Sequence, residues 1–144
     1  MERIYCSKLS QLSEAVMRII DICKNETIWV FKGQMGAGKT TIIKGIAEHF
    51  QIVDQVSSPT FSLVNEYQDT RGELYFHFDF YRVEDPVEAL DIGVDEYFYS
   101  GQYCWIEWAE KVAAYIPGDF ALIDISVGEN QERIITINII RDGR

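Results

Sequence analysis

The chain has 144 residues, of which 47% are hydrophobic, and its 23 acidic and 13 basic residues give it a formal net charge of −10. This length predicts a single domain over residues 1–144, and the apolar fraction argues against a disordered chain. The negative charge, with no three adjacent Lys or Arg residues, argues against direct binding to nucleic acid, so any action on RNA is expected to be indirect.

The cysteines and the apolar runs indicate where in the cell the protein acts. No apolar run approaches the length needed to cross a bilayer, and the first residues lack the layout of a signal peptide. Cys6, Cys23 and Cys104 are widely spaced and form no C-x-x-C pair, which argues against a disulfide framework and against a zinc site. We therefore expect a cytoplasmic protein that does not act at a membrane.

The first half of the chain alternates strand and helix patterns. Residues 2–6 predict a short edge strand, and apolar residues at spacings of three and four predict an amphipathic helix from about residue 10 to residue 24. The β-branched and aromatic run at residues 27–31 predicts a strand covered on both faces. A glycine-rich loop follows, and apolar residues with helical spacing then predict a helix that begins near Lys39.

Two hairpins dominate the rest of the pattern. Residues 61–67 and 74–81 predict one hairpin, with leucine and phenylalanine on one face of its second strand and polar side chains on the other. Asp85-Pro86 with Glu88 predicts a helix start, and residues 94–99 a second short helix. A buried strand at residues 103–106 ends at Glu107, a short helix precedes Pro117-Gly118, and Phe120–Val127 with Arg133–Ile140 predict a closing hairpin.

The glycine-rich loop matches the Walker A pattern. It reads Gly33-Gln-Met-Gly-Ala-Gly38-Lys39-Thr40 and stands between a predicted strand and a predicted helix. Glycines let successive N–H groups point at phosphates, and the helix N-terminus adds positive potential. Lys39 would reach the β- and γ-phosphates and the Thr40 hydroxyl would bind Mg²⁺. An ordinary glycine-rich turn is the alternative, but the flanking elements favour an α/β, three-layer P-loop NTPase fold with a mixed β-sheet.

Two carboxylates are candidate metal or catalytic groups. Glu107 ends a buried strand, where P-loop enzymes hold Mg²⁺ through water, although a solvated surface residue is the alternative. Asp79 lies on the polar face of its strand together with His77 and Tyr81. A carboxylate beside an imidazole can orient a water, bind Mg²⁺ through water or accept a proton. A hydrogen-bonded polar patch explains that face equally well.

Three further patterns bear on the reaction class. A threonine in the loop Ser57-Ser-Pro-Thr60 could sense a γ-phosphate, although spacing alone favours an ordinary turn. The guanine-reading pattern Asn-Lys-x-Asp is absent, which argues against a GTPase. Arg71 and Arg82 are the only arginines between Gly38 and Glu107, whereas a small-molecule kinase usually needs several in its lid.

Together these segments resemble the TsaE family (older name YjeE) of bacterial ATPases in the tRNA threonylcarbamoyladenosine pathway. The resemblance covers nearly the whole chain in order. It rests on Gly33-Gln-Met-Gly-Ala-Gly-Lys-Thr-Thr41, Ser58-Pro-Thr-Phe61, His77-Phe-Asp-Phe-Tyr-Arg82 and Ile106-Glu-Trp-Ala-Glu110. The histidine-containing segment and the Glu-Trp pair after a buried strand are its most specific parts.

The resemblance implies a slow, Mg²⁺-dependent ATPase that supports threonylcarbamoyl transfer to adenosine 37 of tRNA. It would act with the proteins TsaD and TsaB, resetting the transferase between turnovers. The family pattern implies catalytic roles for Asp79, Lys39 and Glu107, and Mg²⁺ binding by Thr40, Glu107 and Asp79. Nucleotide binding is expected at Gly33, Met35, Gly36, Ala37, Gly38, Lys39, Thr40, Thr41, Thr60, Trp108 and Arg133. Leu12 stands where the family is expected to have a threonine, which puts adenine contacts from that segment in doubt.

Two other functions remain as alternatives. A free-standing small P-loop kinase would transfer phosphate to a small acceptor. A nucleotide-gated binding module would need ATP binding but not its hydrolysis.

Overall fold

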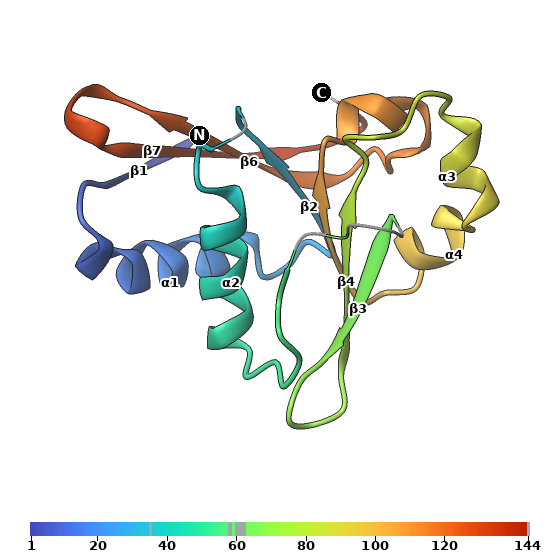
Figure 1. The fold of residues 1–144 in the computed structure, drawn as a ribbon, viewed down its shortest axis with the longest axis horizontal. Helices are drawn as coiled ribbons and strands as arrows, with labels where there is room; N and C mark the ends of the chain where they lie inside the picture. Colours follow the sequence, from blue (N-terminus) through green and yellow to red (C-terminus); the bar gives the residue numbers. More distant parts are fainter. Residues whose placement is uncertain (35, 58, 60–62, 144) are drawn as a thin grey trace.

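The seven strands in the described part of the chain lie in one mixed sheet. The computed structural model describes residues 1–34, 36–57, 59 and 63–143, and the strand order is β1-β7-β6-β2-β5-β4-β3 (Figure 1). The strands are β1 (Glu2–Cys6), β2 (Ile28–Lys32), β3 (Val64–Gln68), β4 (Leu74–Asp79), β5 (Tyr103–Glu107), β6 (Phe120–Val127) and β7 (Arg133–Ile140). The centre, β6-β2-β5-β4, is parallel, and the outer pairs β1–β7, β7–β6 and β4–β3 are antiparallel. The predicted mixed sheet is confirmed.

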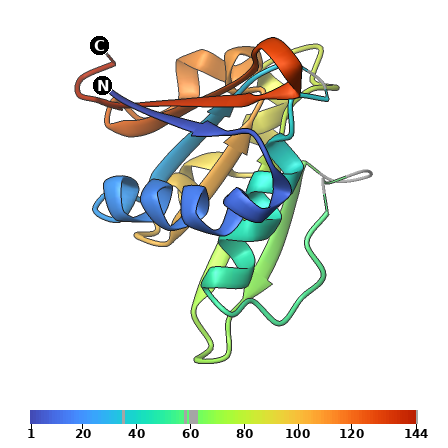
Figure 2. The same cartoon turned by 90° about the vertical axis from the view of Figure 1, so that its left-hand side faces the viewer.

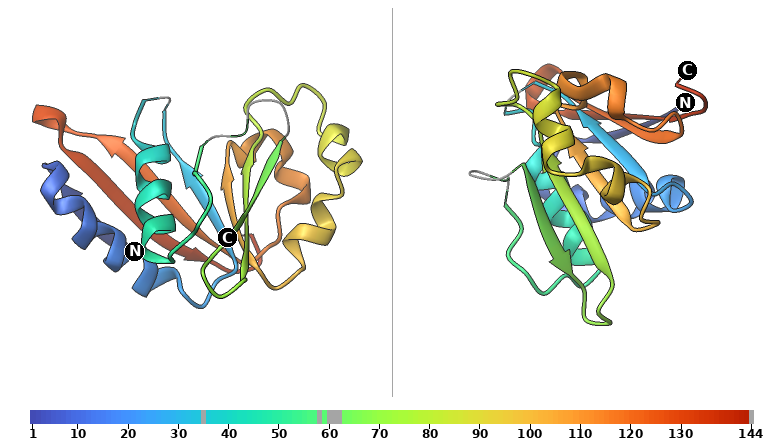
Figure 3. Two further views of the ribbon diagram at one scale, coloured as in Figure 1. Left: turned by 60° about the horizontal axis from the view of Figure 1, so that its bottom comes forward. Right: turned by 90° about the vertical axis from the view of Figure 1, so that its right-hand side faces the viewer.

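Helices cover both faces of this sheet. The helices are α1 (Leu12–Cys23), α2 (Lys39–His49), α3 (Val87–Asp91) and α4 (Val94–Phe98), and 3₁₀ turns occupy Leu9–Gln11, Ala109–Tyr115 and Glu129–Gln131. Figures 2 and 3 show α1 and α2 on one side of the sheet and α3 and α4 on the other. The molecule therefore has the three layers expected from its pattern.

Two hydrophobic clusters separate the layers, because successive side chains of a strand point to opposite faces. Trp29 and Phe31 of β2 pack with α1 and α2, whereas Ile28 and Val30 of the same strand pack with α3 and α4. This strand is covered on both faces, as its apolar run predicts.

Most predicted boundaries are confirmed to within one or two residues. The first turn of the predicted N-terminal helix is 3₁₀, so α1 itself begins at Leu12. Near α3, the carboxylate of Asp85 accepts the N–H of Val87 at 3.0 Å and that of Glu88 accepts the N–H of Asp85 at 3.0 Å. The side-chain hydrogen bonds expected of a capping box are thus present, but α3 begins one residue later than predicted, at Val87 with Pro86 as its N-cap. The strand predicted at residues 74–81 is shorter, as β4 ends at Asp79. The strand predicted at residues 61–67 appears as β3 from Val64 to Gln68, and residues 61 and 62 lie outside the part of the chain that the structure describes.

The polar face of β4 is largely buried. Tyr75 and His77 on that face have 3% and 0% of their surface exposed, and both are hydrogen-bonded to other side chains. Phe50 at the end of α2 packs against Tyr75, and Tyr75 belongs to the hydrophobic cluster on the side of the sheet that α1 and α2 cover.

Candidate functional site

The loop between β2 and α2 has the backbone conformation that its glycines allow. Gly36 and Gly38 have φ values of 83° and 104°, in the left-handed region where other residues are strained. The loop begins with a close approach, since a Cβ added to Gly33 would lie 2.6 Å from the carbonyl oxygen of Ile125 on β6. Gly38 leads into α2, whose N-terminus has no side-chain cap. The first N–H groups of α2 therefore lie at the end of the loop, where the positive end of the helix favours an anion.

Lys39 lies at the start of α2, and 7% of its surface is exposed. Its Nζ is 4.1 Å from the centroid of the Trp108 ring, which makes a cation–π contact. Trp108 directly follows β5 and has a φ of 59°, an uncommon conformation for an aromatic residue. Its ring also contacts that of Tyr81, with centroids 4.9 Å apart. Trp108 thus links the P-loop lysine to the segment after β4.

The two candidate carboxylates lie on neighbouring parallel strands. Asp79 and Glu107 are register partners at the carboxyl ends of β4 and β5, so their side chains share one face of the sheet. Glu107 is 3% exposed, and its Oε2 lies 2.7 Å from Nε2 of His77. Asp79 is partly exposed, and its Oδ1 accepts the N–H of Tyr81 at 2.9 Å.

Burial raises the pKa of Asp79 above its usual value, and the negative charge of Glu107 raises it further. The hydrogen bond from the Tyr81 N–H lowers this pKa, as do the charges of His77 and Lys39. Asp79 is thus a carboxyl group in a partly apolar setting beside a cation. Such a setting is typical of groups that handle protons or metal-bound water.

These side chains meet around one cleft of about 350 Å³. It is lined by Gly36, Gly38, Lys39, Thr40, Thr41, Asp79, Glu107, Trp108 and Arg133. The fold therefore gathers predicted residues from four separate segments of the chain. Met35 and Thr60 were also predicted to bind nucleotide, but they lie outside the residues that the structure describes.

Arg133 comes from the far end of the sequence, at the start of β7. A Cβ added to Gly38 would lie 3.1 Å from its Nε, so the guanidinium group lies against the P-loop. Arg133 also lines a neighbouring cleft of about 300 Å³ with Cys6, Leu12 and Thr41. Arg133, which was predicted to bind nucleotide, thus lies beside the loop, and its role in binding stays a prediction.

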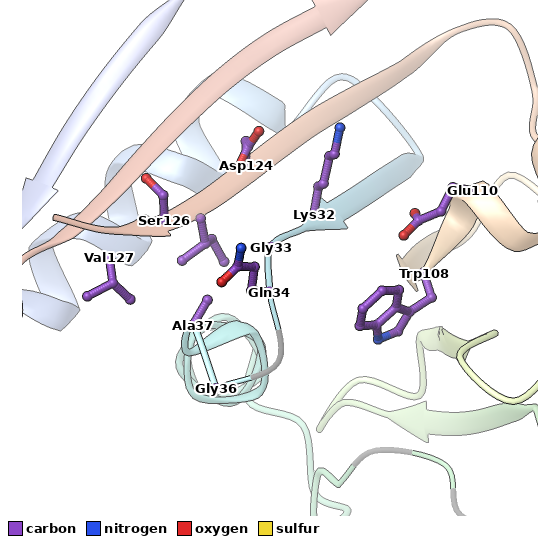
Figure 4. Close-up of a pocket in the computed structure, with 11 residues that line it drawn as sticks. Lys32, Gly33, Gln34, Gly36, Ala37, Trp108, Glu110, Asp124, Ser126 and Val127 are labelled. Atoms are coloured by element: carbon purple, nitrogen blue, oxygen red, sulfur yellow. The ribbon is translucent and has the colours of Figure 1, made fainter.

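The remaining P-loop residues, Gly33 and Ala37, line a third and larger cleft of about 540 Å³. Figure 4 shows Gln34 and Ala37 of the loop on one side and Trp108 with Glu110 across from them, while Asp124, Ser126 and Val127 come from β6. Gly36 and Trp108 are shared with the cleft that contains Lys39, so the two hollows meet at the loop.

The residue that sequence reasoning left without a specific role is His77. Its Nδ1 lies 2.9 Å from the hydroxyl of Tyr67 and its Nε2 is bound to Glu107. The period-two pattern placed His77 on the correct face, but its partners depend on the register of β4 with β3 of the same hairpin and with β5, which is distant in sequence. The sequence motif thus singled out His77, but its hydrogen bond to Glu107 could not be derived from the motif.

The donor groups in this cleft fit a phosphate ester with Mg²⁺. Loop N–H groups and Lys39 suit phosphate oxygens, and a hydroxyl with one or two carboxylates suits Mg²⁺, which usually keeps several waters. In the described part of the chain, no group of three or more His, Cys, Asp and Glu side chains could hold a metal ion alone.

Comparison with known proteins agrees with this arrangement. The family model described as threonylcarbamoyl adenosine biosynthesis protein TsaE matches residues 6–135. A tRNA threonylcarbamoyladenosine biosynthesis protein TsaE from Bacillus subtilis is 41% identical over 113 residues, which cover 78% of this chain and 70% of that protein. Its namesake from Haemophilus influenzae is 37% identical over 102 residues, covering 71% of this chain and 64% of that protein.

A solved structure has the same fold. The crystal structure of YdiB from Bacillus subtilis matches with a TM-score of 0.74 and 25% identity, covering 96% of this chain and 85% of that one. Within the described residues, no helix is long and apolar enough to cross a membrane. The matched family model, the relatives and the P-loop architecture lead to one assignment: the chain belongs to the TsaE family.

Proposed function

We propose that this protein binds ATP with Mg²⁺, hydrolyses it slowly, and thereby supports threonylcarbamoyl transfer to adenosine 37 of tRNA together with TsaD and TsaB. The observation that carries the proposal is the cleft in which Lys39 of the P-loop meets Asp79 and Glu107. A chain of the TsaE family with this cleft has both the phosphate-binding loop and the carboxylates that a P-loop ATPase needs.

The division of work among these residues follows from their chemistry. The N–H groups of the loop from Gly33 to Gly38 and the Lys39 ammonium would hold the phosphates. The Thr40 hydroxyl and Glu107 would hold Mg²⁺, with Asp79 reaching it through water. When bound, Mg²⁺ would neutralise charge that develops on the phosphate oxygens. Asp79 would orient the attacking water and accept its proton, a role that its raised pKa favours.

We further propose that the cleft beside Thr41 and Arg133 receives the base. Lys39 would hold the β- and γ-phosphates, and the cleft of about 300 Å³ opens beside Thr41, further along the same helix. Leu12 supplies an apolar wall there and Arg133 a flat guanidinium group that can stack on a purine. Contact with a leucine rather than a hydroxyl at residue 12 predicts weak discrimination among bases on this side.

Partner proteins, rather than this chain, would contact the RNA. The net charge of −10 opposes binding to a polyanion, so tRNA would meet the assembly through TsaD or TsaB. The name shared by the relatives refers to the pathway as a whole, and this division of labour is our inference.

Reconstitution tests the proposal directly. Purified protein should hydrolyse ATP slowly in Mg²⁺ without any acceptor, and turnover should increase when TsaD and TsaB are added. Multiple rounds of tRNA modification by TsaD and TsaB should require this protein. If the protein instead phosphorylates a small molecule and leaves tRNA modification unchanged, the kinase alternative is correct.

A pair of variants separates hydrolysis from gating by binding. Lys39→Ala should remove binding, whereas Asp79→Asn should keep binding and remove hydrolysis. If both variants fail to support repeated modification, hydrolysis itself is required. If Asp79→Asn supports modification like the wild type, the protein acts as a nucleotide-gated binding module.

A further inference from the structure

A continuous chain of hydrogen bonds leads from an exposed loop to the buried carboxylate of the site. The Tyr67 hydroxyl lies 2.9 Å from the carbonyl oxygen of Ser57 and 2.9 Å from Nδ1 of His77. Nε2 of His77 lies 2.7 Å from Oε2 of Glu107. Tyr67, His77 and Glu107 are 3%, 0% and 3% exposed, so water hardly competes with these bonds.

Three adjacent strands build this chain. Tyr67 lies on β3, His77 on β4 and Glu107 on β5, and the register of the sheet places them diagonally on one face. Tyr75 and Trp105 pack beside these residues on the same face. Burying an imidazole and a carboxylate in such a place costs free energy unless their partners are positioned well. Apolar side chains of similar size would fill the same space without this cost, so packing alone does not explain these polar residues.

At the loop end of the hydrogen-bonded series, both backbone groups of Ser57 form hydrogen bonds with side chains of β3. Ser57 offers its carbonyl oxygen to the Tyr67 hydroxyl and to Nδ2 of Asn65, the latter at 2.9 Å, and its N–H donates to the Tyr67 oxygen at 3.3 Å. Ser57 itself is exposed and belongs to the segment that follows α2. A displacement of this backbone would therefore change the bonding of Tyr67 directly.

The other end of the chain orients a functional group. Glu107 lines the cleft with Lys39 and Asp79, and His77 occupies one of its two carboxylate oxygens. A glutamate side chain has several rotatable bonds, and a buried bond to an imidazole restricts them. Groups that orient a metal-binding carboxylate in this way often change metal affinity when they are removed.

We propose that Tyr67 and His77 are positioning residues, which connect the backbone at Ser57 to the carboxylate of Glu107. Through them, the conformation of the segment after α2 and the orientation of Glu107 depend on each other. The effect on Mg²⁺ rests on the proposed function, in which Glu107 helps to hold the ion, whereas the connection itself is independent of any ligand.

The protein offers a matched pair of tyrosine variants for testing this connection. Tyr67→Phe removes the hydroxyl that joins Ser57 to His77. Tyr75→Phe removes the hydroxyl of an equally buried residue, the cross-strand partner of Tyr67, and that hydroxyl is bound to Asp69 at 2.8 Å near the hairpin turn. Both variants lose one buried hydroxyl, but Tyr67→Phe alone interrupts the connection to Glu107.

The first experiment uses the protein without ligand. Glu107→Gln is introduced into the wild type, into Tyr67→Phe and, as a control, into Tyr75→Phe. The backbone amide NMR shift of Ser57 is compared with and without Glu107→Gln in each of these three backgrounds. We expect Glu107→Gln to shift the Ser57 amide in the wild type and in Tyr75→Phe, and to leave it unchanged in Tyr67→Phe. An equal response in the Tyr67→Phe background, or no response in the wild type, would overturn the connection.

The second experiment measures its consequence for Mg²⁺. ADP binding is followed by calorimetry in EDTA and across a Mg²⁺ titration. We expect Tyr67→Phe to raise the Mg²⁺ concentration for half-maximal effect about 10-fold, the lower end for such groups, with unchanged ADP affinity in EDTA. Tyr75→Phe should titrate like the wild type.

His77→Gln serves as a second variant in the NMR comparison. Its side-chain amide can still donate to Glu107, but it loses the contact with the Tyr67 hydroxyl. The amide shift of Ser57 should therefore no longer respond to Glu107→Gln.

The two experiments separate the possible failures. If the wild type binds no ADP with or without Mg²⁺, the proposed function is wrong, and the NMR comparison still decides the connection. If the wild type depends on Mg²⁺ and Tyr67→Phe titrates like Tyr75→Phe, the positioning role is wrong while the proposed function stands.

Discussion

The Lys39 ammonium lies over the face of the Trp108 ring, with Nζ 4.1 Å from the ring centroid. A cation over an indole is worth about 0.5–2 kcal/mol, depending on how far it is desolvated. Phosphate oxygens would offer Lys39 charge-assisted hydrogen bonds, which are stronger. Nucleotide binding should therefore move Lys39 away from Trp108.

That exchange of partners predicts a fluorescence signal. Trp29 and Trp105 are fully buried in the core, so Trp108 is the tryptophan whose surroundings change when the cleft fills. We expect ATP to change the emission of the wild type and to leave that of Trp108→Phe unchanged. A full response in Trp108→Phe would show that the signal comes from the core and that Lys39 does not change partners.

Lys39→Ala should abolish productive ATP binding without unfolding the protein. Lys39 contacts a ring at the edge of the cleft rather than a buried ion, so the apo protein should lose only about 1 kcal/mol of stability. Calorimetry with ATP and a melting curve of the apo protein check the two parts. A variant with normal melting and normal ATP affinity would contradict the assignment of the P-loop.

Glu107→Gln should weaken the dependence on Mg²⁺ more than it weakens nucleotide binding. The loop N–H groups and Lys39 still hold the phosphates, whereas a neutral amide is a poorer ligand for Mg²⁺ than a carboxylate. Hydrolysis rates across a Mg²⁺ titration should shift to higher concentrations, and ADP affinity in EDTA should stay the same. Titration like the wild type would show that Glu107 only satisfies His77.

Local patterns were sufficient to predict most of the fold. The strand at β2, the helix start at Lys39 and the closing hairpin each depend on residues close in sequence, through periodicity, glycine conformation or turn composition. The three-layer sheet was predicted for the same reason, because strand–loop–helix units and hairpins restrict the possible topologies.

The contacts of the site were predictable only where a motif carried them. Asp79 and Glu107 were both singled out, yet their pairing on β4 and β5 depends on a sheet register that no local pattern encodes. The bond between His77 and Glu107 and the position of Trp108 over Lys39 arise from the same register and from one left-handed residue. Such long-range relations had to come from the structure.

Packing between α1 and α2 predicts an unfavourable effect of Gly45→Ala. Alanine improves helix propensity by about 1 kcal/mol, but its Cβ would lie 2.9 Å from Cγ2 of the buried Val16. Overpacking a core commonly costs about 1–3 kcal/mol, and a β-branched neighbour has little freedom to turn away. We expect a net loss of stability in urea unfolding.

A double-mutant cycle isolates that contact. In a Val16→Ala background the clash is gone, so Gly45→Ala should become neutral or stabilising there, whatever Val16→Ala costs by itself. Equal effects of Gly45→Ala in both backgrounds would show that the two helices do not approach as closely as the structure indicates.

The isolated protein should not bind tRNA at physiological salt. Its net charge is −10, and each phosphate contact would need a basic group that the chain does not cluster. Filter binding of labelled tRNA, with TsaD and TsaB as the positive control, measures this. Micromolar binding by this protein alone would contradict the proposal that it reaches tRNA only through partners.

Asp79→Asn tests the mechanism itself. The Asp79 side chain lies on the cleft face of β4 as the register partner of Glu107, and asparagine can keep the hydrogen bond from the Tyr81 N–H, so the fold should be retained. In the proposed function the loop N–H groups and Lys39 bind the phosphates, so the ATP affinity of Asp79→Asn should stay within several-fold of that of the wild type. Asparagine cannot accept the proton of the attacking water, so hydrolysis should fall about 10²-fold or more. Single-turnover rates with saturating ATP measure this loss separately from binding. Unchanged turnover would make Asp79 a structural residue, and a collapse of ATP affinity would move it to the binding site and leave Glu107 as the catalytic carboxylate.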